Sequence, residues 1–359
     1  MKLRTRKRRV HVIDDPNPFL ERGRDEECLA TWWNQATPGT TYWRCLVPAR
    51  RLPGQCIPVT RIDVQMPEEG VFVFPRQRGD AAIWQFLGDE MRTKMAFGMR
   101  AINDTKLVIE VDDNYTRQPP IFDGRFQRPW KKTREEAKGG YSHEQHRLIL
   151  PMADAVICAT ESLADVYSDF NDNVHVCPNS VDPADWRFER EPHDAFRIVY
   201  YGSPSHVKDA PLVTEALKWA SRQPGVEVWT VGFKVPSWSF EYQTRPWMPQ
   251  LHQAREALFR YDLGIAPLVP NKWANGKSDV KALEYAMAGV MPLVSRTEPY
   301  RPWWDKPDFV VENGDWLERI RWAVQNQDEV RILARDAREH VLSKRTIHHN
   351  IKLWKAAIF

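Results

Sequence analysis

The sequence contains no run of about 18 apolar residues, which is the length that a membrane-spanning helix requires. Cysteine is scarce as well: the five cysteines are odd in number and show none of the close spacings that metal sites use. A disulfide framework is therefore not expected, and free thiols favour a reducing cytoplasm. The net charge is only +3, which does not by itself indicate a nucleic-acid partner. The basic N-terminus also lacks the apolar stretch of a secretory signal.

With 359 residues, the chain is long enough for two domains that each have a hydrophobic core. Its 42% hydrophobic and 28% charged residues are typical of a globular protein. Residues 1–40 are polar, and six of the first nine are Lys or Arg. We expect an irregular, solvated extension here, with contact to phosphate or an anionic surface as the alternative.

Apolar runs alternate with helical patterns in two successive series, beginning near Tyr42. The first series predicts strands at 71–74, 106–111, 155–159 and 174–177 and helices at 49–52, 89–102, 143–152 and 161–167. The second series predicts strands at 197–201, 226–231, 263–268 and 291–295 and helices at 209–221, 251–260, 280–288 and from 316 onward. Strands that alternate with helices indicate parallel, doubly wound sheets, so the predicted fold class is α/β with two Rossmann-like domains.

The two series also set the expected domain boundaries. The predicted units are an N-terminal domain at 41–185, a linker at 186–196, a C-terminal domain at 197–335 and a last helix at 336–359 that packs back on the first domain. Residues 115–138, rich in Pro, Arg and aromatic side chains, are predicted to form a long excursion. Two such domains leave a cleft between the carboxyl ends of their sheets, where ligands bind in open parallel sheets.

The segment 277–290 is the strongest functional signal in the chain. It follows a predicted buried strand and a small-residue loop, begins with Lys277 and continues as a helix that carries Glu284. Free N–H groups and the helix dipole favour a phosphate at such a helix start. Glu284, two turns further on, is placed to accept hydrogen bonds from sugar hydroxyls attached to that phosphate. The segment therefore predicts a nucleotide-sugar site.

Together with three other regions, this segment resembles the retaining glycosyltransferases of the GT-B fold, in the group 1 superfamily, and above all their phage and bacterial members. The matching segments are 153–156 with 159–163 and 176–182, 201–209, 262–268 and 277–289. Their order and spacing are shared over roughly residues 150–295, and the combination is more specific than any one piece.

The resemblance implies transfer of a sugar from a nucleotide-diphosphate donor, a UDP- or GDP-sugar, to an acceptor hydroxyl, with retention of configuration. The C-terminal domain would bind the donor and the N-terminal domain the acceptor, which is a protein, a glycan or a modified nucleic acid. No metal or other cofactor would be required. The location would be the cytoplasm, or the host cytoplasm for a phage protein.

Breaking the sugar–phosphate bond leaves extra negative charge on the diphosphate, and donors fixed near that charge supply a large catalytic effect. Lys208 and Lys277 are the candidates for this role, while Glu284 is the candidate for the ribose hydroxyls. Loop positions expected to assist in donor binding are Gly202, Ser203, Ser205, Ser278 and Asp279. Each lysine has a simpler interpretation as a surface residue beside a helix start.

His206 and Asp112 are further catalytic candidates at the ends of predicted strands. His206 would donate to a phosphate or sugar hydroxyl, or serve only as a structural hydrogen-bonding group. Asp112, with its neighbour Asp113, would orient or deprotonate the acceptor hydroxyl, or form a turn or helix cap. Weaker candidates at the same topological position are Arg76, Arg78 and Asp80.

One position departs from the pattern of the resemblance. Many relatives carry a second glutamate eight residues before the one that matches Glu284, and here that position is Gly276. The donor-sugar contact is then lost or is taken over by Lys277, Ser278 or Asp279. The departure leaves open a non-catalytic nucleotide- or glycan-binding module and, less strongly, a nucleotide-sugar epimerase. The basic N-terminus keeps modified DNA open as an acceptor.

Overall fold

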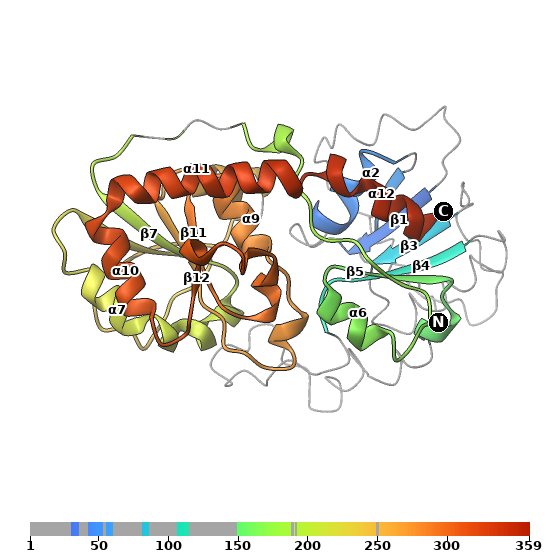
Figure 1. Ribbon diagram of the computed structural model, residues 1–359, viewed down its shortest axis with the longest axis horizontal. Coiled ribbons are helices and arrows are strands. Elements are labelled where there is room, and N and C mark those ends of the chain that lie inside the picture. Colours follow the sequence, from blue (N-terminus) through green and yellow to red (C-terminus); the bar gives the residue numbers. More distant parts are fainter. Residues whose placement is uncertain are drawn as a thin grey trace, which may run out of the picture.

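A computed structural model describes residues 30–35, 42–52, 55–59, 81–85, 106–114, 149–187, 190, 192–248 and 251–359. These residues form two α/β domains that lie side by side, each built on its own sheet (Figure 1). No helix in this described part is long and apolar enough to cross a membrane.

The N-terminal sheet has six strands in the order β2-β1-β3-β4-β5-β6, and every neighbouring pair is parallel. The strands are β1 (Ala30–Gln35), β2 (Gln55–Val59), β3 (Ala81–Gln85), β4 (Lys106–Val111), β5 (Ala155–Cys158) and β6 (Val174–Val176). Burial explains the largely apolar sequences of β4 and β5, because strands in a parallel sheet are covered on both faces. Helix α6 (Glu161–Tyr167) follows β5 and begins where the Thr160 side chain accepts a hydrogen bond from the Leu163 N–H.

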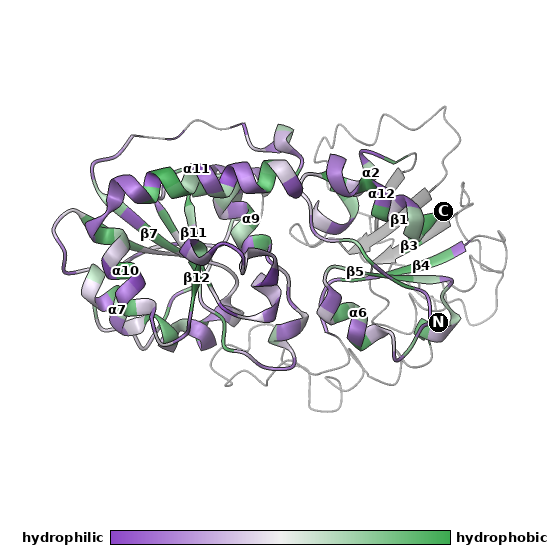
Figure 2. Cartoon of the chain, in the orientation of Figure 1, coloured by the Kyte–Doolittle hydropathy of each residue, from purple (hydrophilic) through white to green (hydrophobic). Residues whose placement is uncertain are grey.

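The C-terminal sheet is also six-stranded and parallel, in the order β12-β11-β10-β7-β8-β9. Its strands are β7 (Phe196–Tyr201), β8 (Val226–Val231), β9 (Gln243–Arg245), β10 (Leu263–Ala266), β11 (Met291–Ser295) and β12 (Val310–Val311). Its helices are α7 (Thr214–Ala220), α8 (Leu251–Leu258), α9 (Val280–Met287), α10 (Trp316–Gln325) and α11 (Gln327–Lys344). Helices α9 and α11 pack against β11, while α7 packs against β8 and α10. Figure 2 shows apolar strands inside this domain and polar outer turns on α11.

Two connections join the domains and run next to each other. The first leads from β6 to β7, and the second leads from α11 to the last helix, α12 (Ile347–Ile358). Val181 of the first connection pairs with Thr346 of the second in a parallel bridge. Helix α12 returns to the N-terminal domain, where it packs on β5, β6 and the short α2 (Val47–Ala49). The C-terminal end of the chain thus contributes to the core of the first domain.

Several sequence predictions differ from the structure. Residues 30–35, predicted to be irregular, form β1 in the N-terminal sheet, so this domain includes residues before 41. Strand β3 was not predicted, and residues 42–49 form a π-helix followed by α2. The predicted helix at 209–221 begins instead as a 3-10 helix over Pro204–Leu212, because Pro211 interrupts regular α-helical bonding before α7.

Other predictions lie outside the described residues. They are the strand at 71–74, the helix at 89–102, the excursion at 115–138 and the candidates Arg76, Arg78 and Asp80. Of the predicted helix at 143–152, the structure describes the end, where Leu150–Met152 form a short 3-10 helix. The central and C-terminal elements agree closely with prediction, and β11 has the predicted bounds.

Candidate active site

A cavity of about 250 Å³ lies between the two domains, at the carboxyl ends of β4, β7 and β10. Ligands bind at this edge of open parallel sheets. Trp43, Arg44, Asp112, Asp113 and Asn179 line it from the N-terminal domain. The C-terminal domain contributes α9 and the segments that follow β7, β9 and β10, including Tyr201, Gly202, Ser203, His206, Trp247, Lys277, Ser278, Lys281 and Glu284.

The predicted lysines converge on one tryptophan. The Nζ atoms of Lys208 and Lys277 lie 4.2 and 3.8 Å from the centre of the Trp273 ring. Both ammonium groups thus form cation–π contacts with the same indole. Lys277 also forms an ion pair with Asp113 Oδ1 at 3.5 Å. Burial lowers the pKa of Lys208, which Lys277 lowers further, while Asp209 opposes the shift. The positive charges of these lysines repel one another, and a bound diphosphate would offset this repulsion.

A third lysine, Lys281, completes the cluster and was not predicted. It lies on the first turn of α9, where its side chain reaches the loop after β7. Burial lowers the pKa of Lys281 to about 7; Lys277 adds to this shift, and the carboxylates of Asp209 and Glu284 oppose it. Gly202 makes room for this approach, because a Cβ atom there would lie 2.7 Å from Lys281 Nζ and 2.6 Å from His206 Cδ2.

Glu284 lies one turn beyond Lys281 on α9 and is only 6% exposed, although it lines the cavity. Burial raises the pKa of Glu284 to about 7, and Arg255, Lys281 and the indole N–H of Trp43 oppose this rise. The helical spacing places both side chains on the same face of α9. The carboxylate therefore lines the same cavity as Lys277 and Lys281.

His206 is brought into the cavity as a neutral group. Its Nδ1 lies 3.3 Å from Oδ2 of Asp209, whose other oxygen accepts a hydrogen bond from the Val269 N–H at 3.0 Å. Burial lowers the pKa of His206 to about 3; Lys281 lowers it further, and the hydrogen bond to Asp209 opposes the shift. An imidazole in this state provides a hydrogen bond but no positive charge at neutral pH.

The pair of aspartates after β4 also enters the cavity, with Asp113 nearer to the lysines. Burial raises the pKa of Asp113 to about 6; Lys277 opposes the rise and Asp112 adds to it. The sequence-based choice fell on Asp112, which lines the cavity together with Asp113. Asp113 forms the ion pair with Lys277. Asp112 and Asp113 are adjacent and both lie beyond the end of β4, so the strand pattern does not show which of them faces the lysines.

Three predicted donor-site residues are not among the cavity lining: Lys208, Ser205 and Asp279. Asp279 is 2% exposed and has its carboxylate occupied elsewhere. It accepts hydrogen bonds from Arg345 at 2.6 and 2.9 Å and from the Trp303 indole at 3.1 Å. Asp279 therefore anchors the start of α9 rather than facing a ligand. Ser205 Oγ is hydrogen-bonded to Ser203 Oγ at 2.7 Å.

Gly276 has no room for a side chain. A Cβ atom there would lie 2.6 Å from Cβ and 3.0 Å from N of Asn114, which reaches across from the N-terminal domain. The Asn114 side chain also donates a hydrogen bond to the Lys272 carbonyl at 3.2 Å. At the position where many relatives carry a glutamate, the two domains of this protein therefore approach too closely for a side chain.

An exposed aromatic platform closes the other side of the cavity. Trp247 is 46% exposed and stacks on Tyr201 with ring centres 5.8 Å apart and planes 6° from parallel. Gly232 lies beneath it at φ +93°, and a Cβ atom there would lie 2.8 Å from the Trp247 ring. A flat ligand group can stack on such a surface.

This arrangement of two facing parallel-sheet domains with a cleft at their carboxyl edges matches several solved structures. The Anabaena protein HepE in complex with UDP aligns with a TM-score of 0.59 at 11% identity, covering 91% of this chain and 99% of HepE. This chain has the GT-B fold. An alpha-glucosyltransferase bound to UDP-glucose and to DNA containing an abasic site aligns with a TM-score of 0.54 at 9% identity, covering 77% of this chain and 79% of that protein.

TarM aligns with a TM-score of 0.53 at 13% identity over 77% of this chain, and this GT-B chain spans about half of TarM, 54% of its length. No protein-family model matches the sequence, and a search of curated proteins finds no relative. The likeness to solved structures therefore establishes the fold alone.

Proposed function

We propose that this GT-B protein is a glycosyltransferase that moves a sugar from a UDP-sugar to an acceptor hydroxyl. The observation that carries the proposal is the convergence of Lys277, Lys281 and Glu284 in one interdomain cavity, with Lys208 beside it. Two structural neighbours were solved in complex with UDP or UDP-glucose, which supports uridine as the base. GDP-sugars are the alternative donors.

In the proposed mechanism, the lysine cluster neutralises the diphosphate as the sugar–phosphate bond breaks. Lys277 and Lys281 stabilise the leaving group more strongly than the intact donor, because negative charge grows during the step. Glu284 accepts hydrogen bonds from the ribose hydroxyls, and Tyr201 with Trp247 offers a stacking surface to the base. We propose that these side chains serve without a metal ion, and that the sugar is transferred with retention.

On the acceptor side, Asp113 is the group best placed to hold the incoming hydroxyl. It lies at the end of β4 in the N-terminal domain and faces Lys277 across the cleft. Its pKa of about 6 leaves it ionised at neutral pH, so it can accept a hydrogen bond from the acceptor. We propose a cytoplasmic location, where nucleotide sugars are available.

DNA is a second candidate acceptor. The motivation is the DNA bound by one structural neighbour, together with the six basic residues among the first nine of this chain. If DNA is the acceptor, its affinity should fall steeply with salt, because cations are released from the phosphates. A salt-independent response of transfer to DNA oligonucleotides would remove this candidate.

The proposed function is tested by thermal shift with UDP-, GDP-, dTDP- and ADP-sugars. One nucleotide class should raise the melting temperature, because a ligand that binds only the folded state adds RT ln(1 + [L]/Kd) to stability. Donor hydrolysis, followed by release of the free nucleotide, should occur with the same class. Binding without hydrolysis or transfer would favour the non-catalytic module, and no shift with any nucleotide would contradict the proposal.

The pKa of Lys281 makes nucleotide affinity depend on pH. Above about pH 7 the free protein has lost the Lys281 proton, so binding an anionic diphosphate must take a proton up again. UDP affinity is therefore expected to fall with rising pH, by up to about tenfold per pH unit from this one group. Glu284 also has a pKa of about 7, and its ionisation should increase UDP affinity as the pH rises. This contribution to affinity is expected to be smaller, because the ribose hydroxyls that Glu284 binds are neutral.

Calorimetric titration of UDP between pH 6 and 9 checks this dependence. Lys281→Met should bind more weakly at low pH and show a flat profile, whereas Glu284→Gln should keep the fall above pH 7. A wild-type profile that rises with pH, or one that Lys281→Met leaves unchanged, would show that Lys281 does not bind the diphosphate.

A further inference from the structure

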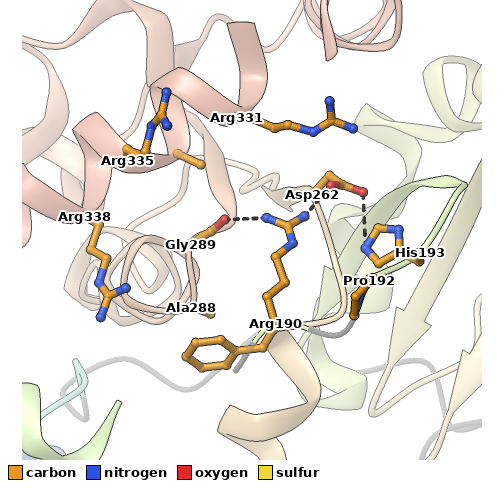
Figure 3. Close-up of a pocket in the computed structure, with 11 residues that line it drawn as sticks. Arg190, Pro192, His193, Asp262, Ala288, Gly289, Arg331, Arg335 and Arg338 are labelled. Atoms are coloured by element: carbon orange, nitrogen blue, oxygen red, sulfur yellow. Dashed lines mark hydrogen bonds and ion pairs between the residues drawn. The ribbon is translucent and has the colours of Figure 1, made fainter. Parts of the chain in front are cut away.

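A second cavity, of about 580 Å³, lies on the C-terminal domain outside the donor cavity (Figure 3). It borders Asp262, which directly precedes β10, and Gly289, which precedes β11. The amino end of β10 thus borders this cavity, and the segment after its carboxyl end borders the donor cavity. Along α9 the two cavities approach to within about one helical turn, because Glu284 lines the donor cavity and Ala288 lines this one.

Three arginines of α11 line this second cavity. Arg331, Arg335 and Arg338 are spaced four and three residues apart, which places them on one face of the helix. Arg331 pairs with Asp328 at 2.6 Å on the exposed side. Within the described part of the chain, the side chains of Arg335 and Arg338 have no hydrogen-bond or ion-pair partner, and Nε of Arg338 is nevertheless buried. Two guanidinium groups thus border the cavity without an anion.

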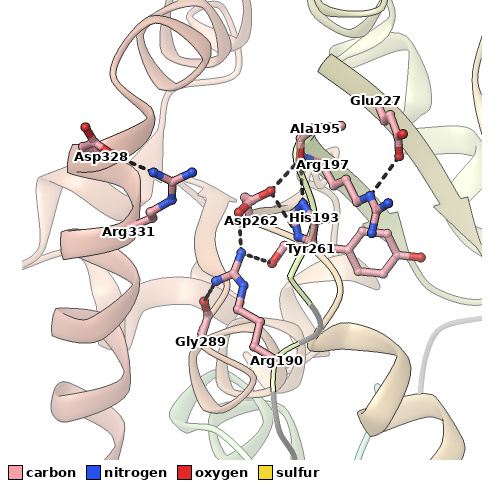
Figure 4. Close-up of polar contacts among 10 residues, drawn as sticks. All are labelled: Arg190, His193, Ala195, Arg197, Glu227, Tyr261, Asp262, Gly289, Asp328 and Arg331. Carbon is pink, nitrogen blue, oxygen red and sulfur yellow. Dashed lines mark hydrogen bonds and ion pairs between the residues drawn. The ribbon is translucent and has the colours of Figure 1, made fainter. Parts of the chain in front are cut away.

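Asp262, the carboxylate that lines the cavity, does not neutralise these arginines. Its Oδ1 pairs with Arg190, and its Oδ2 accepts a hydrogen bond from the Arg197 N–H at 2.8 Å (Figure 4). Arg190 is held in place by the carbonyls of Tyr261 and Gly289, at 3.1 and 3.2 Å. Among the described residues, the lining carries four arginines and one carboxylate, which is already paired.

A histidine with a buried side chain also lies at the cavity wall, and one of its ring nitrogens has no hydrogen-bond partner. The His193 side chain is 8% exposed, and its Nδ1 lies 2.7 Å from the Ala195 carbonyl, so Nδ1 carries a proton. Its Nε2 is buried without a hydrogen-bond partner, 3.8 Å from Oδ2 of Asp262. Unpaired buried polar atoms are rare, so a ligand group that could satisfy them is favoured.

The remaining lining is apolar: Phe259, Ala288 and Ala334 are each at most 5% exposed and border the same cavity. We propose that this cavity is a binding site for a small phosphorylated molecule that also carries an apolar group. Arg335 and Arg338 hold the phosphate, since guanidinium groups match its oxygens in pairs of hydrogen bonds. The apolar group lies over Phe259 and the alanines. The inference stands independently of sugar transfer, because no donor-cavity residue takes part.

The site borders the helix that carries the donor residues. Ala288 and Gly289 follow the last turn of α9, and Lys281 and Glu284 lie on the same helix toward the donor cavity. The first connection between the domains contributes Arg190 and His193. A ligand here would contact both the domain connection and the end of the donor helix.

Phenyl phosphate is a suitable probe, because it combines a phosphate with an apolar ring. Its binding to the full chain is measured by calorimetry in a Lys208→Ala/Lys277→Ala background, which weakens the donor cavity. Arg335→Gln/Arg338→Gln should reduce the affinity by about tenfold or more, since each charge-assisted hydrogen bond contributes on the order of a factor of ten. Inorganic phosphate should bind more weakly than phenyl phosphate and respond to the same variant.

The matched control is Arg222→Gln/Lys234→Gln, which removes two exposed positive charges elsewhere on the same domain and should bind as the parent does. Equal loss in both double variants would reveal general charge attraction and overturn the site. Unchanged binding in Arg335→Gln/Arg338→Gln would overturn it as well. A short oligothymidylate that binds more tightly than phenyl phosphate, through the same arginines, would instead identify a nucleic-acid surface and overturn the small-molecule assignment.

Discussion

Lys277→Ala is expected to lower kcat for sugar transfer or donor hydrolysis by roughly 10²- to 10³-fold, the loss that follows removal of one preorganised donor from a developing anion. Lys277 lines the interdomain cavity, contacts the Trp273 ring and pairs with Asp113. The interaction strengthens as the diphosphate leaves, so kcat should fall more than the affinity for the intact donor. Steady-state kinetics with the donor identified by thermal shift measures both quantities.

Lys272→Ala is the control for this experiment. Lys272 lies in the same loop and is exposed, and its backbone carbonyl accepts a hydrogen bond from the Asn114 side chain. Its removal subtracts the same charge from the same region and should leave kcat within about twofold of wild type. Wild-type turnover and UDP affinity in Lys277→Ala would contradict the assignment of the diphosphate site. An equal loss of kcat in both variants would instead indicate a general electrostatic effect of the positive charge in this loop.

Arg345→Met is expected to destabilise the protein by about 3–5 kcal/mol, the usual cost of leaving one member of a buried ion pair without its partner. Arg345 is 9% and Asp279 2% exposed, and the two guanidinium nitrogens donate to the two carboxylate oxygens at 2.6 and 2.9 Å. After the substitution, the Asp279 carboxylate would keep the hydrogen bond from the Trp303 indole. Urea unfolding measures the change.

Two further variants separate the buried pair from general effects. Arg301→Met removes an exposed arginine 3.7 Å from Glu298 and should cost at most about 1 kcal/mol. Arg345→Met combined with Asp279→Leu should recover part of the lost stability, because no charge is left unpaired. A small loss in Arg345→Met, similar to that in Arg301→Met, would show that the pair is not needed.

The same arginine also links the domains to the donor loop. Arg345 Nη2 donates to the Asn179 carbonyl at 3.1 Å, and the Asn179 side chain donates to Ser278 Oγ at 2.8 Å. Arg44, buried and paired with Glu110, donates to the side-chain oxygen of Asn179 at 3.2 Å. This chain of polar contacts connects the N-terminal core to the residues beside Lys277. Arg345→Met should therefore also weaken nucleotide binding.

The sequence predicted the parts of the site that depend on local pattern. The apolar run at 263–268 and the helical pattern beyond Lys277 predicted β10 and α9, and the structure contains both, with Glu284 and Lys277 lining one cavity. Local order also indicated the second phosphate-type loop after β7. Such features are encoded by neighbouring residues, whose periodicity and small side chains fix the backbone before any distant contact is made.

The sequence alone therefore determined that this protein is a two-domain α/β chain and where its donor helix lies. The tertiary structure alone decided that Lys281 reaches the lysine cluster, because its approach depends on the absence of a side chain at Gly202. It alone decided that Asp279 faces Arg345, 66 residues away, and that Asn114 fills the space beside Gly276. Which charges become buried and paired depends on residues far apart in the chain, and the energies of such contacts have no local signature.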